Sequence, residues 1–325
     1  MSENHEPTSV QQRPTKMLID GVWHSSVEDT PELRRRRIKE REKWFRDVVS
    51  SDSSSDFPIE PRRYHLYVSF ASSWAHRAIL YRRLKCLEDV ISMSVLHPKW
   101  DGPHGWTFGD SEMSTRDHVA GHDYLYEIYQ ESKPDFTGKV TVPVLFDRKT
   151  RRIVNNEPFE IMRMLDGAFN AWGKCSQNFY PEALRPEIDS LNRLILEDVA
   201  EGVYRAGFAQ TQLRYDNAIK RLFAALDELE RILQHKSFLL GERVTESDWH
   251  LFPVLVRFDA VYYPLLRCNV RRITDYPGLS AYLRRLHRLP GVSGTVRPDQ
   301  IKLHFEQSDL PINQSIVPAG SIAVQ

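Results

Sequence analysis

Apolar residues recur at helical spacing through the second half of the chain. Between residues 216 and 233 they stand three and four positions apart, which predicts a helix with one buried face: Ile219, Leu222, Leu226, Leu229 and Leu233. Further on, Thr245 and Asp248 precede another apolar run and are expected to form a capping box at the start of a helix. Pro253 lies within that run and is expected to kink the helix. The pattern predicts an all-helical domain over residues 175–325.

The middle of the chain has a different pattern, which predicts strands that alternate with a helix. Residues 64–70 and 90–95 are rich in β-forming residues, and a helical pattern over 74–86 separates them. The order β-α-β is typical of an α/β domain. A long stretch from His97 to Lys139 follows, and we expect it to be an irregular insert.

After the insert, two short apolar runs flank a polar turn. Residues 142–146 and 152–154 are therefore expected to form a β-hairpin, followed by a helix over 157–165. Pro143 interrupts the first run, so we expect it at a sheet edge or in a cis peptide bond. Together these elements predict an α/β domain over residues 61–168.

The first 60 residues form an N-terminal extension. Residues 1–15 are polar and are expected to be disordered. Residues 17–23 predict a short hairpin that turns at Asp20-Gly21. A charged surface helix is expected over 31–49, because apolar residues near its end form a stripe, and a serine-rich linker over 50–56.

The composition limits the binding partners and the cellular location that we expect for this protein. The chain has 325 residues with 44 basic and 44 acidic side chains, so its zero net charge gives no support for nucleic-acid binding. The four arginines at 34–37 lie among acidic residues and predict a solvated helix face rather than a binding patch. No apolar run is long enough to span a membrane. The cytoplasm is therefore the expected location.

The cysteines and histidines predict neither disulfides nor a metal site. Three cysteines, Cys86, Cys175 and Cys268, are widely separated and form no Cys-x-x-Cys motif. This spacing is typical of a reducing compartment without a disulfide framework. No cluster of residues has metal-ligand spacing, so no metal is expected.

The junction of a strand with a helix at Ser72-Ser73 is the most informative feature for chemistry. The first N–H groups of a helix are unpaired and the helix dipole is positive there, so such a junction commonly holds an anion or a reactive sulfur. A serine at this position is, however, also the usual N-cap residue. By itself, Ser72 therefore leaves both interpretations open.

The residues after this junction give a resemblance to a known family. Trp-Ala-His-Arg at 74–77 resembles the active-site signature Cys-Pro-Trp-Ala-His-Arg of the glutathionyl-hydroquinone reductases, the xi class of the glutathione transferases. Ser72 stands in the place of the catalytic cysteine and Ser73 in that of the proline. Similar stretches occur in order along nearly the whole chain, among them residues 20–24, 63–68, 105–108, 140–145, 202–209, 256–262 and 268–273. The resemblance implies a thioredoxin-like domain joined to an all-helical domain, and a homodimer.

The resemblance also implies a set of glutathione contacts. Trp106 matches the tryptophan that covers the tripeptide, and Val140 lies in the segment that offers backbone bonds to it. Lys139 stands where the family usually has arginine, which keeps the charge but loses the bidentate fork. Glu157 matches the acid that holds the γ-glutamyl amine. Pro158 replaces a serine that binds the γ-glutamyl carboxylate, and proline has neither the N–H nor the hydroxyl.

On the substrate side, Tyr204 and Tyr262 match tyrosines that face a quinone-type substrate in the family. A phenol there can donate or accept a proton, although buried tyrosines are also common in helical cores. Tyr263 and His104 are further candidates for contacts with a flat aromatic ligand, with ordinary packing as the alternative. The candidate catalytic residues are thus Ser72, Tyr204 and Tyr262.

Three functions remain open at this point. The first is a glutathione S-transferase that acts on an aromatic or quinone-like molecule, with Ser72 orienting the sulfur. The second is a glutathione-independent isomerase, cyclase or lyase of aromatic metabolite biosynthesis. The third is a binding protein without catalysis. The family's reductase chemistry ranks behind these, because a hydroxyl cannot take the place of the thiolate in disulfide exchange.

Overall fold

The fold is taken from a computed structural model of the 325-residue chain. It describes residues 15–28, 30–41, 45–52, 54–100, 102–175 and 177–320. The prediction of disorder for residues 1–15 concerns residues outside these ranges, apart from Thr15. No helix of the described residues is both long and apolar enough to cross a membrane.

A four-stranded mixed sheet forms the centre of the first domain. Its strands are β3 (Tyr64–Val68), β4 (Ser92–Val95), β5 (Val144–Asp147) and β6 (Arg152–Asn155), in the order β4-β3-β5-β6. Strand β3 is parallel to β4 across the helical crossover and antiparallel to β5, and β5 and β6 form a hairpin. This topology confirms the β-α-β unit, the following hairpin and the thioredoxin-like fold.

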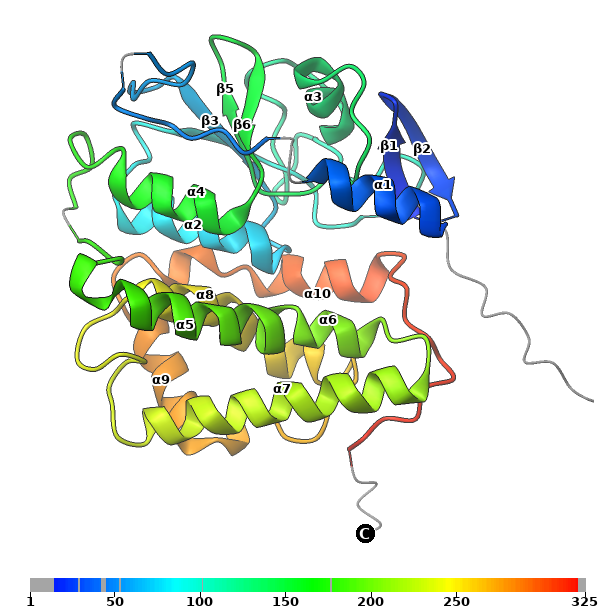
Figure 1. Ribbon diagram of the computed structural model, residues 1–325, viewed down its shortest axis with the longest axis vertical. Coiled ribbons are helices and arrows are strands. Elements are labelled where there is room, and N and C mark those ends of the chain that lie inside the picture. Colours follow the sequence, from blue (N-terminus) through cyan, green and yellow to red (C-terminus); the bar gives the residue numbers. More distant parts are fainter. Residues whose placement is uncertain are drawn as a thin grey trace, which may run out of the picture.

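Helices cover the sheet on the side of the second domain. Helices α2 (Ser73–Leu84) and α4 (Pro158–Gly167) lie between the sheet and the helical domain, whereas α3 (Leu125–Ser132) lies beside β6, away from that domain (Figure 1). The expectation of a wholly irregular insert was wrong, because α3 lies within it. Its buried residues Leu125, Ile128 and Tyr129 are three and four positions apart, a signal that is short but present in the sequence.

The peptide bond between Val142 and Pro143 is cis, as one of the two alternatives for this proline predicted. Pro143 comes directly before β5 and so lies outside the sheet ladder. Of the residues before it, Lys139, Thr141 and Val142 line a cavity described below.

The second domain consists of helices packed around a shared apolar core. These are α5 (Arg185–Leu194), α6 (Gly202–Gly207), α7 (Gln212–Leu233), α8 (Glu246–Arg257), α9 (Pro277–His287) and α10 (Pro298–Gln307), with π-helical segments at Ile195–Ala200 and Phe258–Tyr262 and 3-10 turns at Glu182–Leu184, Ile273–Asp275 and Ser293–Thr295. The predicted apolar face of α7 is buried. Asp248 accepts the N–H of Thr245 at 2.7 Å, which confirms the capping box. Helix α8 continues through Pro253 as a single element.

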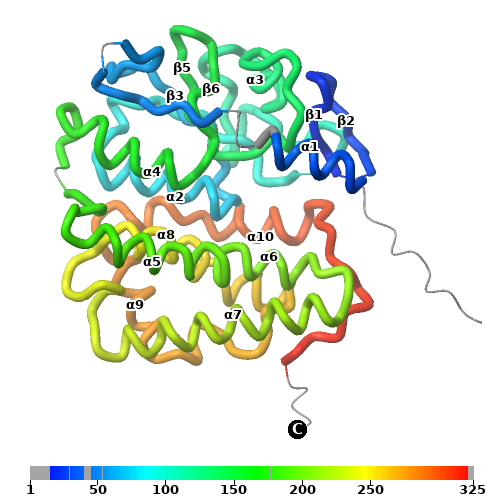
Figure 2. The backbone as a smooth tube through the Cα atoms, in the orientation of Figure 1, coloured from blue at the N-terminus to red at the C-terminus, as the bar shows by residue number. Residues whose placement is uncertain are grey.

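The chain after α10 returns along the helical domain. Figure 2 shows this segment passing the end of α6 and reaching the start of α7. There Val317 exchanges two hydrogen bonds with the side chain of Gln212, and Ala319 donates to the Tyr215 hydroxyl at 2.9 Å. These bonds fix the end of the described chain to α7.

The N-terminal hairpin forms as the sequence predicts. Strands β1 (Thr15–Ile19) and β2 (Val22–Val27) are antiparallel and turn at Asp20-Gly21. Gly21 has φ +77°, and a Cβ there would lie 1.7 Å from the carbonyl oxygen of Pro134. The hairpin is joined to the insert because the backbone of Leu18 pairs with that of Gly138.

The predicted helix over 31–49 is shorter than expected. Helix α1 spans Pro31–Arg41, and from Phe45 the described chain is extended. Arg46 pairs with Asn155, and the Asp47 N–H donates to the carbonyl of Val154, so this segment lies along the edge of β6. Of the apolar residues near the end of this stretch, Phe45 and Val49 are buried and Val48 is exposed, so tertiary pairing with the sheet and not a helix face decides which of them are covered.

Two of the cysteines form a disulfide, so the expectation of none was wrong. Cys86 follows α2 and Cys175 follows α4, and their Cα atoms are 5.8 Å apart across 89 residues of sequence. Helices α2 and α4 pack side by side, and the Lys85 ammonium lies 3.0 Å from the Asp166 carboxylate where both helices end. Cys268 is free and buried.

We predict that Cys86→Ser lowers the free energy of unfolding by about 2–4 kcal/mol, because the crosslink restricts the unfolded chain. Urea unfolding without reductant measures the difference from the unmodified chain. The same comparison in dithiothreitol is the control and should show no difference. Titration of the unmodified chain in denaturant should find one reactive thiol, Cys268, of the three cysteines; three reactive thiols would contradict the pairing.

Candidate functional site

Ser72 and Ser73 begin helix α2 at the boundary between the two domains. Ser72 is the N-cap, and its Oγ accepts the N–H of Ala75 at 3.2 Å. The cap interpretation is thus confirmed, but it uses only a lone pair, so the hydroxyl hydrogen is still available to a ligand. Ser73 is the first helical residue and is buried. Proline is also favoured at this position of a helix.

A chain of hydroxyl groups runs from Ser73 into the helical domain. The Ser73 Oγ lies 3.1 Å from the hydroxyl of Tyr204 on α6, and that hydroxyl lies 3.3 Å from the hydroxyl of Tyr262. Tyr262 is fully buried, and burial raises the pKa of its phenol well above the ordinary value. Tyr204 is half-buried, so it is the member of the chain with access to solvent. The structure therefore brings together both predicted catalytic tyrosines with Ser73.

Three further residues that were predicted to bind substrate or glutathione lie outside this chain of hydroxyl groups. His104 stacks on Tyr124 with ring centroids 4.2 Å apart. Trp106 is buried and stacks on His304 of α10 at 5.7 Å. Tyr263 is half-buried beneath the guanidinium of Arg272, 4.2 Å from its ring centre. Of these three contacts, the stacking of Trp106 on His304 joins the insert to the helical domain.

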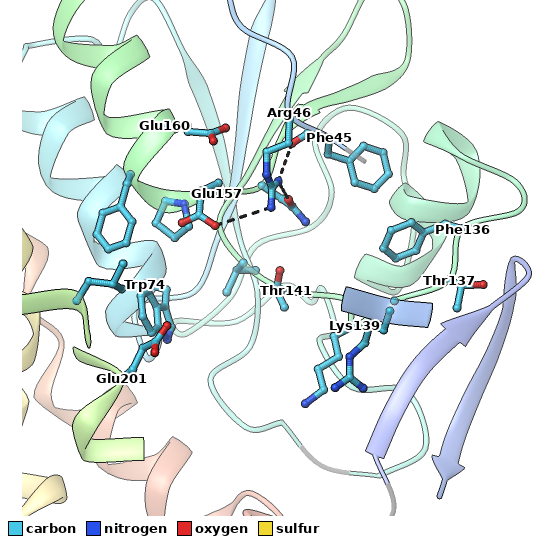
Figure 3. A pocket seen from close by; sticks show the side chains of 17 residues that line it. Phe45, Arg46, Trp74, Phe136, Thr137, Lys139, Thr141, Glu157, Glu160 and Glu201 are labelled. Carbon is cyan, nitrogen blue, oxygen red and sulfur yellow. Dashed lines mark hydrogen bonds and ion pairs between the residues drawn. The ribbon is translucent and has the colours of Figure 1, made fainter. Parts of the chain in front are cut away.

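A cavity of about 740 Å³ opens beside the start of α4, where Figure 3 shows its side chains. Three of its lining residues come from the predicted glutathione set or next to it: Lys139, Glu157 and Pro158. Val140 is buried in the core, and its neighbours Thr141 and Val142 line the cavity instead. The remaining lining residues are Arg37, Phe45, Arg46, Trp74, Phe136, Thr137, Gly138, Asn156, Phe159, Glu160, Leu196 and Glu201.

Trp74 connects this cavity to the hydroxyl chain. Its side chain lines the cavity, and its ring is near parallel to that of Tyr204, with centroids 6.4 Å apart. Glu201, from the helical domain, lies beside Trp74 on the same side of the cavity (Figure 3). The cavity and the phenols thus adjoin each other at the domain boundary.

Charges of both signs surround the cavity. The Arg46 guanidinium lies 3.8 Å from the Glu157 carboxylate and donates to the side-chain carbonyl of Asn156 at 2.7 Å (Figure 3). Arg37 and Lys139 add two further cations to the lining. Such a mixture suits a zwitterionic ligand that carries carboxylates and an ammonium group.

The N-terminal extension supplies two of these cations, and the sequence analysis missed both. Arg37 belongs to the run that was interpreted as a solvated helix face, yet it lines the cavity. Arg46 had no distinguishing signal, because its position depends on the pairing of its backbone with β6. Arg36 does fit the solvated interpretation, since it pairs with Asp20 at the surface.

Helix α4 presents its N-terminus to the cavity, and Pro158 occupies its first position. Proline fits this position because the first N–H of a helix has no partner within the helix. It also removes one of the N–H donors that would otherwise bind an anion there. The Glu160 carboxylate lies in the same turn and accepts the side-chain amide of Asn155 at 2.6 Å.

Among the described residues, no group of three or more His, Cys, Asp or Glu side chains is arranged to hold a metal ion. The chemistry that these residues offer is therefore that of charges, hydroxyl groups and the helix N-termini of α2 and α4.

Two family models match the chain. Residues 71–168 match the glutathione S-transferase N-terminal domain, and residues 212–285 match the glutathione S-transferase C-terminal domain. The matches cover the sheet domain from the start of α2 onward, without strand β3, and the centre of the helical domain.

Full-length relatives and solved structures agree with these models. The chain is 42% identical over 305 residues to the glutathionyl-hydroquinone reductase PcpF of Sphingobium chlorophenolicum, covering 94% of this chain and 96% of that protein. It is 41% identical to a xi-class transferase from Natrialba magadii, with a TM-score of 0.86 over 91% of this chain and 90% of that one. The glutathione-bound structure of the transferase homologue YqjG from Escherichia coli K-12 is 41% identical, with a TM-score of 0.82 over 91% and 92%. The chain belongs to the xi-class glutathione transferase family, which includes the glutathionyl-hydroquinone reductases.

Proposed function

We propose that this protein is a glutathione S-transferase that acts on quinone-like aromatic molecules, with Ser72 in the role of the sulfur-binding residue. The observation that carries the proposal is the cavity of about 740 Å³, in which Lys139, Arg46 and Glu157 surround the N-terminus of α4. Glutathione has two carboxylates and one ammonium group, which match cations and an acid placed in this way. A related structure, that of YqjG, was solved with glutathione bound.

Ser72 would hold the glutathione sulfur at the start of α2. Its Oγ already accepts the N–H of Ala75, so its hydroxyl hydrogen is left to point at the ligand. Donation of that hydrogen, together with the helix dipole, favours the thiolate form of the sulfur. The thiolate adds to an electrophilic ring carbon of the quinone, so a C–S bond forms and the electron pair moves to the quinone oxygen. Tyr204, the half-buried middle member of the hydroxyl chain, would protonate that oxygen.

Reduction of glutathionyl-hydroquinones, for which two of the relatives are named, requires a different first step. A protein thiolate must attack the glutathione sulfur of the conjugate. An S–S bond then forms in a mixed disulfide with glutathione, while the C–S bond breaks and the hydroquinone leaves with a proton added at its ring carbon. In this chain Ser72 stands at the helix N-terminus, Cys86 and Cys175 are paired, and Cys268 is buried with a raised pKa. We propose that this chain has replaced that reaction by conjugation.

A second candidate function is acid–base catalysis without glutathione. It is favoured by the chain of hydroxyls from Ser73 through Tyr204 to Tyr262, and by Pro158, which removes an anion donor from α4. Isomerisation, cyclisation or elimination on an aromatic metabolite would use these phenols as donors. A binding protein without catalysis is the third candidate, and turnover separates it from the second.

The location and assembly remain predictions from the sequence. We propose a homodimer formed through the helical domain, acting in the cytoplasm in aromatic metabolism. Light scattering at several concentrations would establish the oligomeric state.

Glutathione binding tests the proposal directly. We expect measurable but weak binding by calorimetry, and we expect Pro158→Ser to tighten it about 10- to 100-fold, because one charge-assisted hydrogen bond is worth about 1.5–3 kcal/mol. Glu157→Gln should weaken binding. Pro186→Ser is the matched control, since Pro186 also lies in the first turn of a helix, α5, but does not line the cavity. Tight binding that Pro158→Ser leaves unchanged would reject the role given to Pro158, and no binding to either protein would favour the second function.

Turnover tests which hydroxyl carries the reaction. We expect Ser72→Ala to lower glutathione addition to a simple quinone by about 10²–10³-fold, the usual loss for one preorganised donor. Tyr263→Phe should leave the rate unchanged, because its ring lies against Arg272 and its hydroxyl is not part of the chain. Ser72→Cys should gain reduction of a glutathionyl-hydroquinone. An active Ser72→Ala protein that is silenced by Tyr204→Phe would reject the transferase proposal and support acid–base catalysis.

A further inference from the structure

Two fully buried arginines lie against the start of helix α2. Arg77 belongs to α2 and Arg257 ends α8 in the other domain, and both side chains are 0% exposed. Within the described part of the chain, neither guanidinium has a carboxylate at ion-pair distance. A buried charge without a counter-ion is costly, so the retention of two at one place calls for an explanation.

Arg257 binds the loop that precedes Ser72. It donates to the carbonyl oxygen of Phe70 at 2.8 Å and to that of Ala71 at 3.3 Å. It also donates to the carbonyl of Pro253, one turn earlier in its own helix, at 2.9 Å. The positive group of one domain therefore holds the two residues that lead into the N-cap of α2 in the other domain.

His76 lies next to Arg257 and is neutral. Its Nδ1 is 2.9 Å from an Arg257 nitrogen, which can only donate, so Nδ1 is the acceptor and Nε2 carries the hydrogen. Nε2 then donates to the Oγ1 of Thr295 at 2.8 Å, and that hydroxyl donates to the carbonyl of Val292. Burial and the neighbouring guanidiniums of Arg257 and Arg77 lower the pKa of His76 well below its ordinary value. The imidazole adds no charge of its own and fixes Arg257 in place.

Arg77 holds the first turn of α2 itself. It donates to the carbonyl oxygen of Ser73 at 2.9 Å and to that of His250 at 2.7 Å. Its guanidinium lies between the rings of Trp74 and Phe159, 5.0 and 5.3 Å from their centres. Burial lowers the pKa of Arg77 to about 10, which leaves it charged at neutral pH.

The other groups that face this junction do not cancel the two charges. Glu157, at the cavity, is the acid that acts on Arg77, and it is itself paired with Arg46. His250 is buried, and burial with the nearby Arg77 lowers its pKa, so it is neutral. Arg297 lies over the Phe70 ring but is exposed, and Tyr204 and Tyr262 present hydroxyl groups. The net field at the start of α2 is positive, and the helix dipole adds to it.

We propose that Arg77 and Arg257 are positioning residues whose buried charges stabilise an anionic sulfur held against Ser72. The inference rests on the proposed function for the identity of that sulfur as the thiolate of glutathione. The guanidiniums need not touch the sulfur. Hydrogen bonds to the carbonyls of Phe70, Ala71 and Ser73 hold the two guanidiniums on either side of the N-cap. From there their charges act on the sulfur at a distance. Because both guanidiniums are fully buried, their charges are screened less than surface charges would be.

The pKa of a thiol introduced at position 72 reports the electrostatic potential at this place, and no glutathione is needed for the measurement. In Ser72→Cys the ultraviolet absorbance of the thiolate is followed against pH. The native cysteines do not interfere, because Cys86 and Cys175 are paired and burial raises the pKa of Cys268. We expect the introduced thiol to titrate below about 7.5, against about 8.5 for a free cysteine.

Arginine variants in the Ser72→Cys background then test whether the two arginines lower the pKa of the introduced thiol. Arg257→Gln and Arg77→Gln should each raise the pKa of the introduced thiol by about one unit or more, which lowers the thiolate fraction about tenfold at a pH below both values. Arg257→Lys keeps the charge and should keep the low pKa. Arg297→Gln is the matched control, because it removes an exposed arginine beside the same loop, and it should change nothing.

Near-ultraviolet circular dichroism establishes that each variant is folded. If Arg257→Gln does not fold, Arg77→Gln and Arg257→Lys still carry the comparison. An introduced thiol that titrates at the value of free cysteine would overturn the proposal, as would a low pKa that neither glutamine variant changes. Loss of glutathione binding with a low thiol pKa would refute the proposed function and leave this inference standing.

Discussion

The guanidinium of Arg257 is the contact on which the arrangement of the site depends. The loop between β3 and α2 turns in the buried boundary between the domains, where the carbonyls of Phe70 and Ala71 would lack partners without it. Because Arg257 ends α8, the orientation of α2 relative to the helical domain is set by the same side chain. His76 accepts a hydrogen bond from Arg257 and donates one to Thr295, which completes the network. The position of Ser72 is therefore a property of both domains.

The N-terminal extension, in addition to the two domains, contributes residues to the lining of the cavity beside α4. Arg37 and Phe45 line it, and Arg46 pairs with Glu157 across it. The extension reaches this place because its backbone continues the sheet at the edge of β6 and its hairpin pairs with Gly138. An edge strand needs backbone partners, so sheet pairing gives a structural reason for the extension, and its cations then come to line the cavity.

Ser73 and Pro158 occupy equivalent positions of two helices. Ser73 is the first residue of α2, and Pro158 is the first residue of α4. The first position of a helix accepts either residue, because its N–H has no partner within the helix. At the start of α2 the serine places a hydroxyl group beside the tyrosines, where its Oγ lies 3.1 Å from the Tyr204 hydroxyl. At the start of α4 the proline offers neither a hydroxyl nor an N–H on the cavity side.

The sequence by itself determined the β-α-β unit with the hairpin that follows it, the hairpin at Asp20-Gly21, the capping box at Thr245 and the family, because each depends on residues close together in the chain or on a recognisable motif. It also named Ser72, Glu157 and the two tyrosines. Only the tertiary structure decided which partners these residues have. It joined Cys86 to Cys175, brought Arg46 to the cavity, turned Val140 into the core and linked Ser73 to Tyr204. These contacts join residues that are distant in sequence, and the packing of whole helices and the pairing of sheet edges set them, so no local pattern records them.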